Sequence, residues 1–361
     1  MAPPRLRETD PELIRETFRV WMECNKVNSH AADRLGIHEK TVRERLKHAK
    51  DMGFDVDRDG YAARRTPFKP LEFTVAALPE DDEPIDELIA RRKKQYQHKR
   101  AHEEARKLIP VKVKLNGPIG VLHFGDPHVD DDGTDIGLLE HHKKLCETVE
   151  GLFAANVGDI TNNWVGRLGR LYGDQSTSAK QAWKLAEWLI GGSRWLYLIG
   201  GNHDGWSGAG DPLKWIAKQT DSLYQSSEVR MVLNFPNGAT VRVNARHDFA
   251  GGSQWNPAHG PMKAVFHGVR DHISICGHKH KSGYGIIKDP DSGIACHCFQ
   301  VASYKLYDRY ARDKGFRDQT LGPCVLTVID PSMPNDHPDM VKPFWDADEG
   351  VSFLKWKRSR K

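Results

Sequence analysis

Five short segments of this 361-residue chain carry Asp, Asn or His, four of them beside Gly, and they follow one another between residues 125 and 280. Carboxylate and amide oxygens with neutral imidazoles suit Mn²⁺, Zn²⁺ or Fe²⁺, whereas a thiolate-rich site would indicate structural zinc or an iron–sulfur cluster. Together the segments offer enough ligands for two adjacent divalent ions. They are Gly125-Asp126-Pro127-His128, Gly158-Asp159-Ile160-Thr161-Asn162, Gly201-Asn202-His203-Asp204, Arg246-His247-Asp248 and Gly277-His278-Lys279-His280.

Two such ions would support hydrolysis at phosphorus. Held about 3.5–4 Å apart, they can stabilise both the attacking and the departing oxygen and lower the pKa of a shared water, so that a metal-bridging hydroxide attacks near neutral pH. One carboxylate must bridge the ions. We assign this role to Asp159, because it lies between the other segments and follows the apolar run Leu152–Val157, which would hold it rigidly. The sequence therefore predicts a binuclear metallohydrolase.

The order D-x-H, G-D-x-x-N, G-N-H-D, H, G-H-x-H resembles the calcineurin-like metallophosphoesterase superfamily, and in plan its DNA-repair exonuclease branch. The resemblance implies two divalent ions as cofactors, with Mn²⁺ favoured and Zn²⁺ or Fe²⁺ as alternatives, and no nucleotide cofactor. It implies catalytic roles for His203, as the second-sphere acid, and for Asp204. The implied ligands are Asp126, His128 and His280 for one ion and Asn202, His247 and His278 for the other, with Asp159 shared.

The fourth motif departs from the superfamily pattern, which usually reads His-Gly. Here Asp248 follows His247, while His267-Gly268 matches the dipeptide literally. We prefer His247, because it ends an alternating stretch, residues 240–245, that predicts a strand, whereas His267 falls in a segment with helical character.

Short apolar runs bounded by turn signals predict buried strands over residues 119–124, 152–157, 195–199 and 273–276. Helical spacing over residues 136–149 and 179–189 separates the first three runs, so the sheet should be partly parallel and covered on both faces. Residues 229–235 and 240–245 predict an antiparallel hairpin. The fold class expected is α/β, a two-sheet αββα-type metallophosphoesterase sandwich with a small all-α helix-turn-helix domain before it.

That small domain is predicted over residues 1–65. Residues 11–24 predict a helix, and residues 31–46 resemble a helix-turn-helix in which small Ala32 lets two helices approach and Gly36 permits a left-handed turn. The second helix of such a unit fits the major groove of B-DNA. A helical protein-binding or dimerisation module is the alternative. The predicted DNA contacts are Lys40, Thr41, Arg43 and Lys47.

A charged, partly helical linker is predicted over residues 66–110, the metallophosphoesterase domain over 111–335, and a C-terminal extension with a basic tail over 336–361. The linker is acidic at residues 80–87 and basic at residues 91–94 and 99–100, the order that a helix dipole favours. A net charge of +4 is too small to decide whether the linker or the tail contacts DNA. Homo-oligomerisation also stays open.

Composition points away from membranes and export. No apolar stretch approaches eighteen residues, and the first residues lack an apolar secretory region. Six scattered cysteines are simplest as reduced thiols. We therefore expect a cytoplasmic protein, in a bacterium or a phage-infected host.

Three functions follow. The first is a DNA nuclease brought to DNA by its helix-turn-helix, an arrangement that resembles those of phages and mobile elements. Aromatic and Arg residues in segments 164–172 and 205–208, near the ligand-bearing strand ends, would suit base stacking and phosphate binding, or lid packing. The second function, the alternative to the first, is a phosphatase or small-molecule phosphodiesterase with a regulatory or partner-binding N-terminal domain. The third is a DNA-binding protein without activity, which the full ligand set disfavours. Endonuclease and exonuclease action are not distinguished.

Overall fold

The computed structural model describes residues 10–54, 56, 82–205, 211–307 and 320–360. The chain divides into two compact units, Met1–Pro84 and Ile85–Lys361. The division falls within the predicted linker, and the boundaries placed at residues 65, 110 and 335 stay predictions.

The first unit contains three helices around one apolar core: α1 (Pro11–Glu23), α2 (Asn28–Leu35) and α3 (Glu39–Asp51). Gly36 ends α2 in the left-handed conformation, with φ of 65°, as its sequence position predicts. The chain can therefore turn sharply into α3, whose Val42 and Leu46 pack with Trp21 and Ala32. The predicted helix-turn-helix region is confirmed.

The second unit is built on two six-stranded mixed sheets, ordered β1-β6-β7-β8-β10-β9 and β12-β11-β2-β3-β4-β5. In the second sheet β2, β3, β4 and β5 are parallel neighbours, and in the first sheet β7, β8 and β10 are parallel neighbours. The strands are β1 (Ile109–Lys112), β2 (Ile119–Phe124), β3 (Leu152–Asn156), β4 (Trp195–Ile199), β5 (Leu223–Gln225), β6 (Glu228–Asn234), β7 (Thr240–Arg246), β8 (Ile273–Cys276), β9 (Gly283–Lys288), β10 (Ala295–Gln300), β11 (Cys324–Ile329) and β12 (Val341–Phe344).

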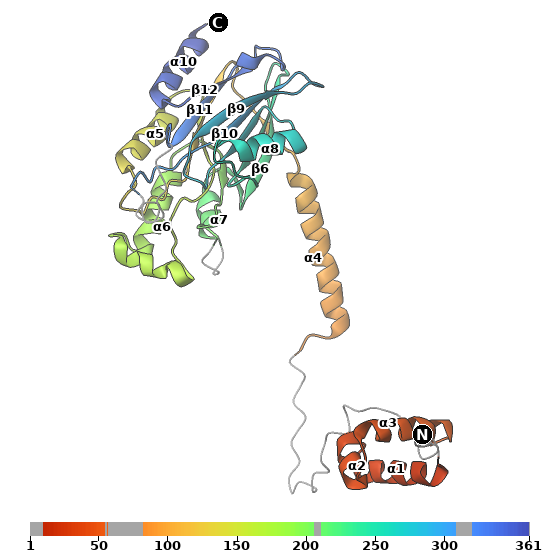
Figure 1. Cartoon of the computed structure of the whole chain (residues 1–361). Coiled ribbons are helices and arrows are strands. Elements are labelled where there is room, and N and C mark those ends of the chain that lie inside the picture. The colour runs from red at the N-terminus through yellow and green to blue at the C-terminus, as the bar shows by residue number, and fades with distance from the viewer. Residues whose placement is uncertain (1–9, 55, 57–81, 206–210, 308–319, 361) are drawn as a thin grey trace. The chain divides into compact units, whose positions relative to one another are not determined.

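Alternating side chains of β2 show how the layers form. Ile119 and Val121 join the apolar core between the two sheets, whereas Leu122 and Phe124 join a second core under the helices. Figure 1 shows α10, α5 and α6 along one side of the sheets and α8 on the other. The predicted αββα-type sandwich is therefore confirmed. The helices and turns of these layers are α5 (Ile136–Thr148), η3 (Gly166–Asp174), α6 (Ala179–Ile190), α7 (Pro212–Ala217), α8 (His259–His267), η4 (Pro338–Met340) and α10 (Ala347–Ser359).

The segment predicted as a C-terminal extension completes these layers. Strand β12 pairs with β11, and Leu354 of α10 is fully buried. Two basic side chains of the predicted tail have structural partners: Lys357 Nζ lies 2.8 Å from Asp330 Oδ2, and Arg358 Nη1 donates to the Pro118 carbonyl at 2.7 Å. These two side chains hold α10 against the sandwich.

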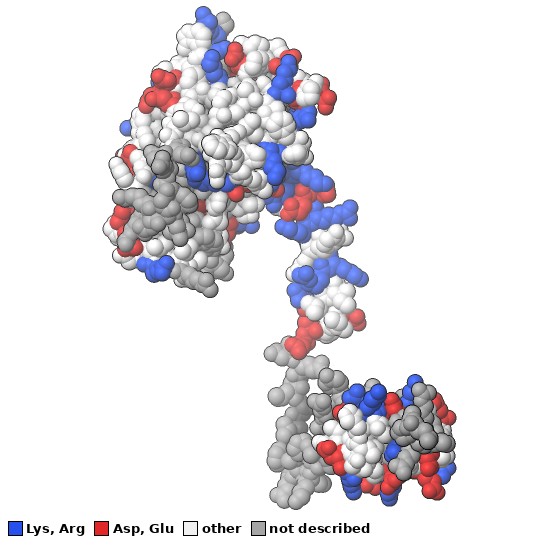
Figure 2. All heavy atoms as spheres, viewed as in Figure 1, with Lys and Arg blue, Asp and Glu red and all other residues white. Residues whose placement is uncertain are grey.

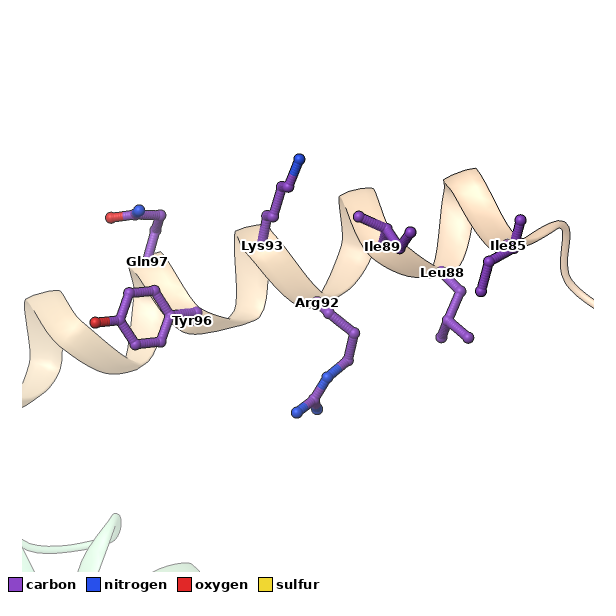
Figure 3. Close-up of a pocket in the computed structure, with 7 residues that line it drawn as sticks. All are labelled: Ile85, Leu88, Ile89, Arg92, Lys93, Tyr96 and Gln97. Carbon is purple, nitrogen blue, oxygen red and sulfur yellow. The ribbon is translucent and has the colours of Figure 1, made fainter.

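Helix α4 (Ile85–Arg106) precedes β1 and buries none of its residues. Basic side chains line most of it, with acidic ones where it begins (Figure 2). Figure 3 shows apolar Ile85, Leu88 and Ile89 on the same stretch as Tyr96. In the part of the chain that the structure describes, no helix has the length and apolar character needed to cross a membrane.

Candidate metal centre

The predicted ligands follow directly from strand ends. Asp126 comes two residues after β2, Asp159 three after β3 and Asn202 three after β4, and these strands are parallel neighbours. Their carboxyl ends therefore lie along one edge of the sheet. In the other sheet, His247 and His278 follow β7 and β8, which are also parallel. Each ligand thus stands where the backbone leaves a buried strand.

One cluster joins Asp126, His128 and His280, whose ligand atoms all lie within 4.8 Å of one another. Nε2 of His128 is 3.2 Å from Nε2 of His280, and that nitrogen is 3.3 Å from Oδ2 of Asp126. Two imidazole nitrogens and a carboxylate oxygen thus converge on one point.

A second cluster joins Asp159, His247 and His278 within the same 4.8 Å limit. Nε2 of His247 is 3.1 Å from Nδ1 of His278, 3.2 Å from Oδ2 of Asp159 and 2.8 Å from Oδ1 of Asn202. Asn202 therefore lies with this cluster.

The two clusters are adjacent. The His278 amide donates to Oδ2 of Asp126 at 2.6 Å, and the His128 amide donates to the Asp159 carbonyl at 3.0 Å. His247 Nδ1, which donates to the Val157 carbonyl at 3.0 Å, is 3.8 Å from Oδ1 of Asp126. All seven predicted ligands are brought together, and they form two neighbouring groups.

Four of these ligands have left-handed backbone conformations: φ is 41° at His128, 47° at Asp159, 69° at His278 and 48° at His280. A non-glycine residue pays about 1–3 kcal/mol for such a conformation, and such residues concentrate at functional sites. These strained conformations lower the stability of the fold, and they direct the four side chains toward common points.

Glycine beside the ligands leaves room for them. A methyl group added at Gly158, where φ is 128°, would overlap the His247 imidazole, and one at Gly201 would overlap the Asp159 carboxylate. Glycine has no side chain to occupy this space. In the structure it admits ligand side chains from neighbouring loops.

The donor set fits divalent metal ions. Oδ1 of Asp126 is buried and has no hydrogen-bond partner among the described residues, an arrangement that a cation would relieve. Two pairs of imidazole nitrogens face each other at 3.1–3.2 Å with carboxylate oxygens beside them. Together with the oxygens this is the mixed N/O set that Mn²⁺, Zn²⁺ or Fe²⁺ accepts. The residues form two His/Asp groups suited to a binuclear site.

Ionisation in the clusters follows from burial and charge. Burial and the neighbouring His280 hold the pKa of His128 well below its usual value. Burial alone would do the same at His247, but the hydrogen bond with Asp159 raises its pKa to about 10. The same hydrogen bond, acting against burial, lowers the pKa of Asp159. Asp159 is therefore a carboxylate in the site.

His203 is held beside the clusters by backbone contacts. Its amide donates to Oδ1 of Asp159 at 3.0 Å, and its Nδ1 donates to the Asn162 carbonyl at 2.6 Å. That bond places the ring proton on Nδ1, so Nε2, 3.9 Å from Oδ2 of Asp159, is the nitrogen that can exchange a proton. The Trp164 ring meets the His203 ring edge-on, with 5.1 Å between centroids.

Asp204 bonds to backbone amides and belongs to neither cluster. Its buried carboxylate accepts from the amides of Gly201 at 2.8 Å, Ile160 at 3.1 Å and Thr161 at 3.4 Å. Burial and the Asp159 charge raise its pKa to about 7. These bonds tie the loop after β4 to the loop after β3.

Sequence reasoning missed a supporting network. Lys305 Nζ lies 2.9 Å from Oδ2 of Asp131 and 5.5 Å from the Trp164 ring centroid, and Asn162 Nδ2 donates to the same Asp131 oxygen at 2.8 Å. This network fixes Asn162, whose carbonyl accepts the hydrogen bond from Nδ1 of His203. The available signals were the acidic run that follows His128 and the Lys that follows the buried strand β10.

The alternative fourth-motif residue, His267, is the exposed last residue of α8 and lies in neither cluster. Trp206, from the aromatic segment 205–208, lies outside the described residues.

The predicted DNA contacts all lie on α3. Lys40, Arg43 and Lys47 are exposed and Thr41 is half-buried. Arg43 also donates to Glu39 at 2.6 Å, one turn earlier. The four side chains share the surface of the second helix of the helix-turn-helix.

Comparison with known proteins gives one family match. The family model of the PucR C-terminal helix-turn-helix domain matches residues 14–60, which include most of α1 and all of α2 and α3. This match suggests DNA binding. No curated protein matches the chain.

Three solved structures are distantly similar. The calcineurin-like phosphoesterase YfkN from Bacillus subtilis is 12% identical, with 67% of this chain and 97% of that chain covered and a TM-score of 0.34. The NAD nucleotidase NadN from Haemophilus influenzae is 10% identical, with 68% and 56% covered and a TM-score of 0.32. A protein of unknown function from Aquifex aeolicus, AQ665, is 14% identical, with 44% and 78% covered and a TM-score of 0.25.

Identities of 10–14% and TM-scores of 0.25–0.34 are too low to support a conclusion about function. The exonuclease branch and the phage or mobile-element origin receive no support from these likenesses and stay predictions.

Proposed function

We propose that this chain is a binuclear metal-dependent phosphodiesterase that acts as a DNA nuclease and is recruited to DNA by its helix-turn-helix. The observation that carries the proposal is the adjacency of the two His/Asp clusters, linked by the 2.6 Å bond from the His278 amide to Asp126. When bound, Mn²⁺ ions would act as Lewis acids and supply a water of lowered pKa. Asp126, His128 and His280 would hold one ion, and Asn202, His247 and His278 the other, with Asp159 shared.

The chain's own residues would move the proton. With Nδ1–H committed to the Asn162 carbonyl, His203 presents Nε2 to a bound phosphoester and, when protonated, donates to the departing oxygen. Asp131 and Lys305 fix Asn162 and Trp164 around that ring. We assign Asp204 a positioning role, because its carboxylate holds the Ile160 and Gly201 amides and so sets the spacing between Asp159 and Asn202.

Three aromatic residues support a polynucleotide substrate. Trp164 follows β3 and packs edge-on against His203, Trp215 lies in α7, and Trp255 lies between β7 and α8. Trp255 is 92% exposed and Trp215 is 71% exposed, with Lys218 Nζ 5.0 Å from the Trp215 ring centroid. Exposed aromatic rings beside cations are the surfaces on which unpaired bases stack. A small phosphomonoester would not need them.

The test compares substrates on one preparation. Purified protein with Mn²⁺ is assayed on plasmid, linear duplex, single-stranded DNA, a chromogenic diester and a chromogenic monoester. We expect cleavage of DNA and of the diester, both lost in His203→Asn. His267→Asn, at the exposed histidine of α8, is the matched control and should keep full activity. Hydrolysis confined to the monoester would replace the proposal with its alternative, a phosphatase with a regulatory N-terminal domain.

A further inference from the structure

Helix α4 presents an apolar stripe that nothing in the described structure covers. The stripe consists of Ile85, Leu88, Ile89 and Tyr96, which line one shallow hollow together with Arg92, Lys93 and Gln97 (Figure 3). Ile85 is 65% exposed, Ile89 43% and Tyr96 64%. Helices in proteins gain most of their stability from packing one face against a neighbour. A 22-residue helix without buried residues therefore lacks its usual source of stability.

Three residues of the stripe, together with Arg92, have the spacing of a two-stranded coiled coil. Ile85, Ile89, Arg92 and Tyr96 are separated by four, three and four residues, which places them on the seam between paired helices. Leu88 flanks the seam on one side, and Asp86 and Lys93 flank it on the other, one turn on either side of Ile89. The seam is short: twelve residues of α-helix rise about 18 Å.

We propose that α4 pairs in antiparallel orientation with α4 of a second copy of this chain. In a pair centred between Ala90 and Arg91, Ile85 meets Tyr96 of the second copy and Ile89 meets its Arg92. Asp86 then faces Lys93 of the second copy, twice, because the pair is symmetric. The acidic beginning and basic middle of α4 are thus complementary to themselves only when the helices run in opposite directions (Figure 2). A parallel pair would align like charges.

The size of the seam sets the strength of the pair. Stable interfaces bury more than about 1,000 Å², and three helical turns provide less than the interfaces of obligate dimers. The dimer is therefore weak and concentration-dependent, and it weakens further as salt screens the Asp86–Lys93 contacts. Each dimer carries two helix-turn-helix units, the number with which many such proteins bind two half-sites. The pairing itself does not depend on the proposed nuclease activity.

Sedimentation velocity of the full chain tests the pairing at 1 to 200 µM. The wild type should shift from monomer to dimer across this range. Ile89→Asp should weaken the dimer at least tenfold, whereas Ala90→Asp, which adds the same charge away from the seam, should leave it unchanged. Circular dichroism checks that both variants keep the wild-type helix content. A wild type that stays monomeric at 200 µM, or a dimer that persists in Ile89→Asp, would overturn the proposal.

Charge exchange tests the orientation. Asp86→Lys and Lys93→Glu should each weaken the dimer, and the double variant should restore it, because each lysine again meets a carboxylate of the second copy. Failure of the double variant to recover would overturn the antiparallel arrangement. If Ile89→Asp instead lost affinity for DNA with no change in mass, the stripe would belong to a DNA contact, and the proposal would be wrong.

Discussion

Gly158→Ala tests whether glycine holds the second cluster open. Gly158 has φ of 128°, and a methyl group there would overlap Nδ1 of His247. The backbone strain should cost about 1–3 kcal/mol of unfolding free energy. The overlap should also displace the His247 ring by roughly 1 Å and break its bond to the Val157 carbonyl, and a displacement of that size typically costs about 100-fold in rate.

The matched control is Gly238→Ala, in the turn between β6 and β7. Gly238 has φ of 88°, but nothing lies within 4 Å of the added methyl group. This variant should lose comparable stability and nothing else. Urea unfolding measures stability, calorimetric Mn²⁺ titration measures affinity, and diester hydrolysis measures rate. We expect Mn²⁺ affinity to fall about 10–100-fold in Gly158→Ala alone. Equal Mn²⁺ affinity in the two variants would refute the reasoning.

Three further predictions concern the acid, the loop tie and the buried histidines. His203→Asn should lower diester hydrolysis at least 100-fold while two Mn²⁺ ions still bind; loss of the metals would show a structural role instead. Asp204→Ala leaves three loop amides unpaired and should destabilise the chain by about 3–5 kcal/mol, whereas Asp204→Asn should cost less than half of that; equal losses measured by urea unfolding would contradict the assignment. Burial lowers the pKa of His123 to about 3 and that of His272 to about 4. Below about pH 6.5, the ordinary pKa of histidine, the unfolded chain therefore binds more protons than the folded chain. The contributions of His123 and His272 to stability should therefore be complete above pH 6.5 and fall toward pH 4, by up to about 1.4 kcal/mol per pH unit for each histidine. Denaturant titrations of the wild type and of His123→Gln at each pH check this: the wild type should lose more stability than the variant between pH 6.5 and pH 4, and equal losses in the two would contradict the prediction.

The strands and the ligands were predictable because a short local sequence pattern indicates each of them. Buried runs such as Ile119–Phe124 are short, apolar and bounded by turn residues, and the structure places β2 over the same residues. Ligands directly follow these runs, so the register of the strands fixes where Asp126 and Asp159 emerge. The parallel order of β2, β3 and β4 then brings the side chains to one edge.

Contacts between distant segments were not predictable in the same way. Lys305 meets Asp131 across 174 positions of sequence, and no local pattern in one chain reveals that pairing. The direction of the Asp204 side chain is a similar case, because its partners, the Ile160 and Thr161 amides, belong to another loop. The overlap of Gly158 with His247 likewise depends on how two sheets pack.

Anomalous diffraction from crystals grown with Mn²⁺ tests the central claim most directly. Two peaks are predicted for each chain, one at the convergence of Asp126, His128 and His280, and one at that of Asp159, His247 and His278. An anomalous map collected at saturating Mn²⁺ that lacks one or both of these peaks would contradict the account.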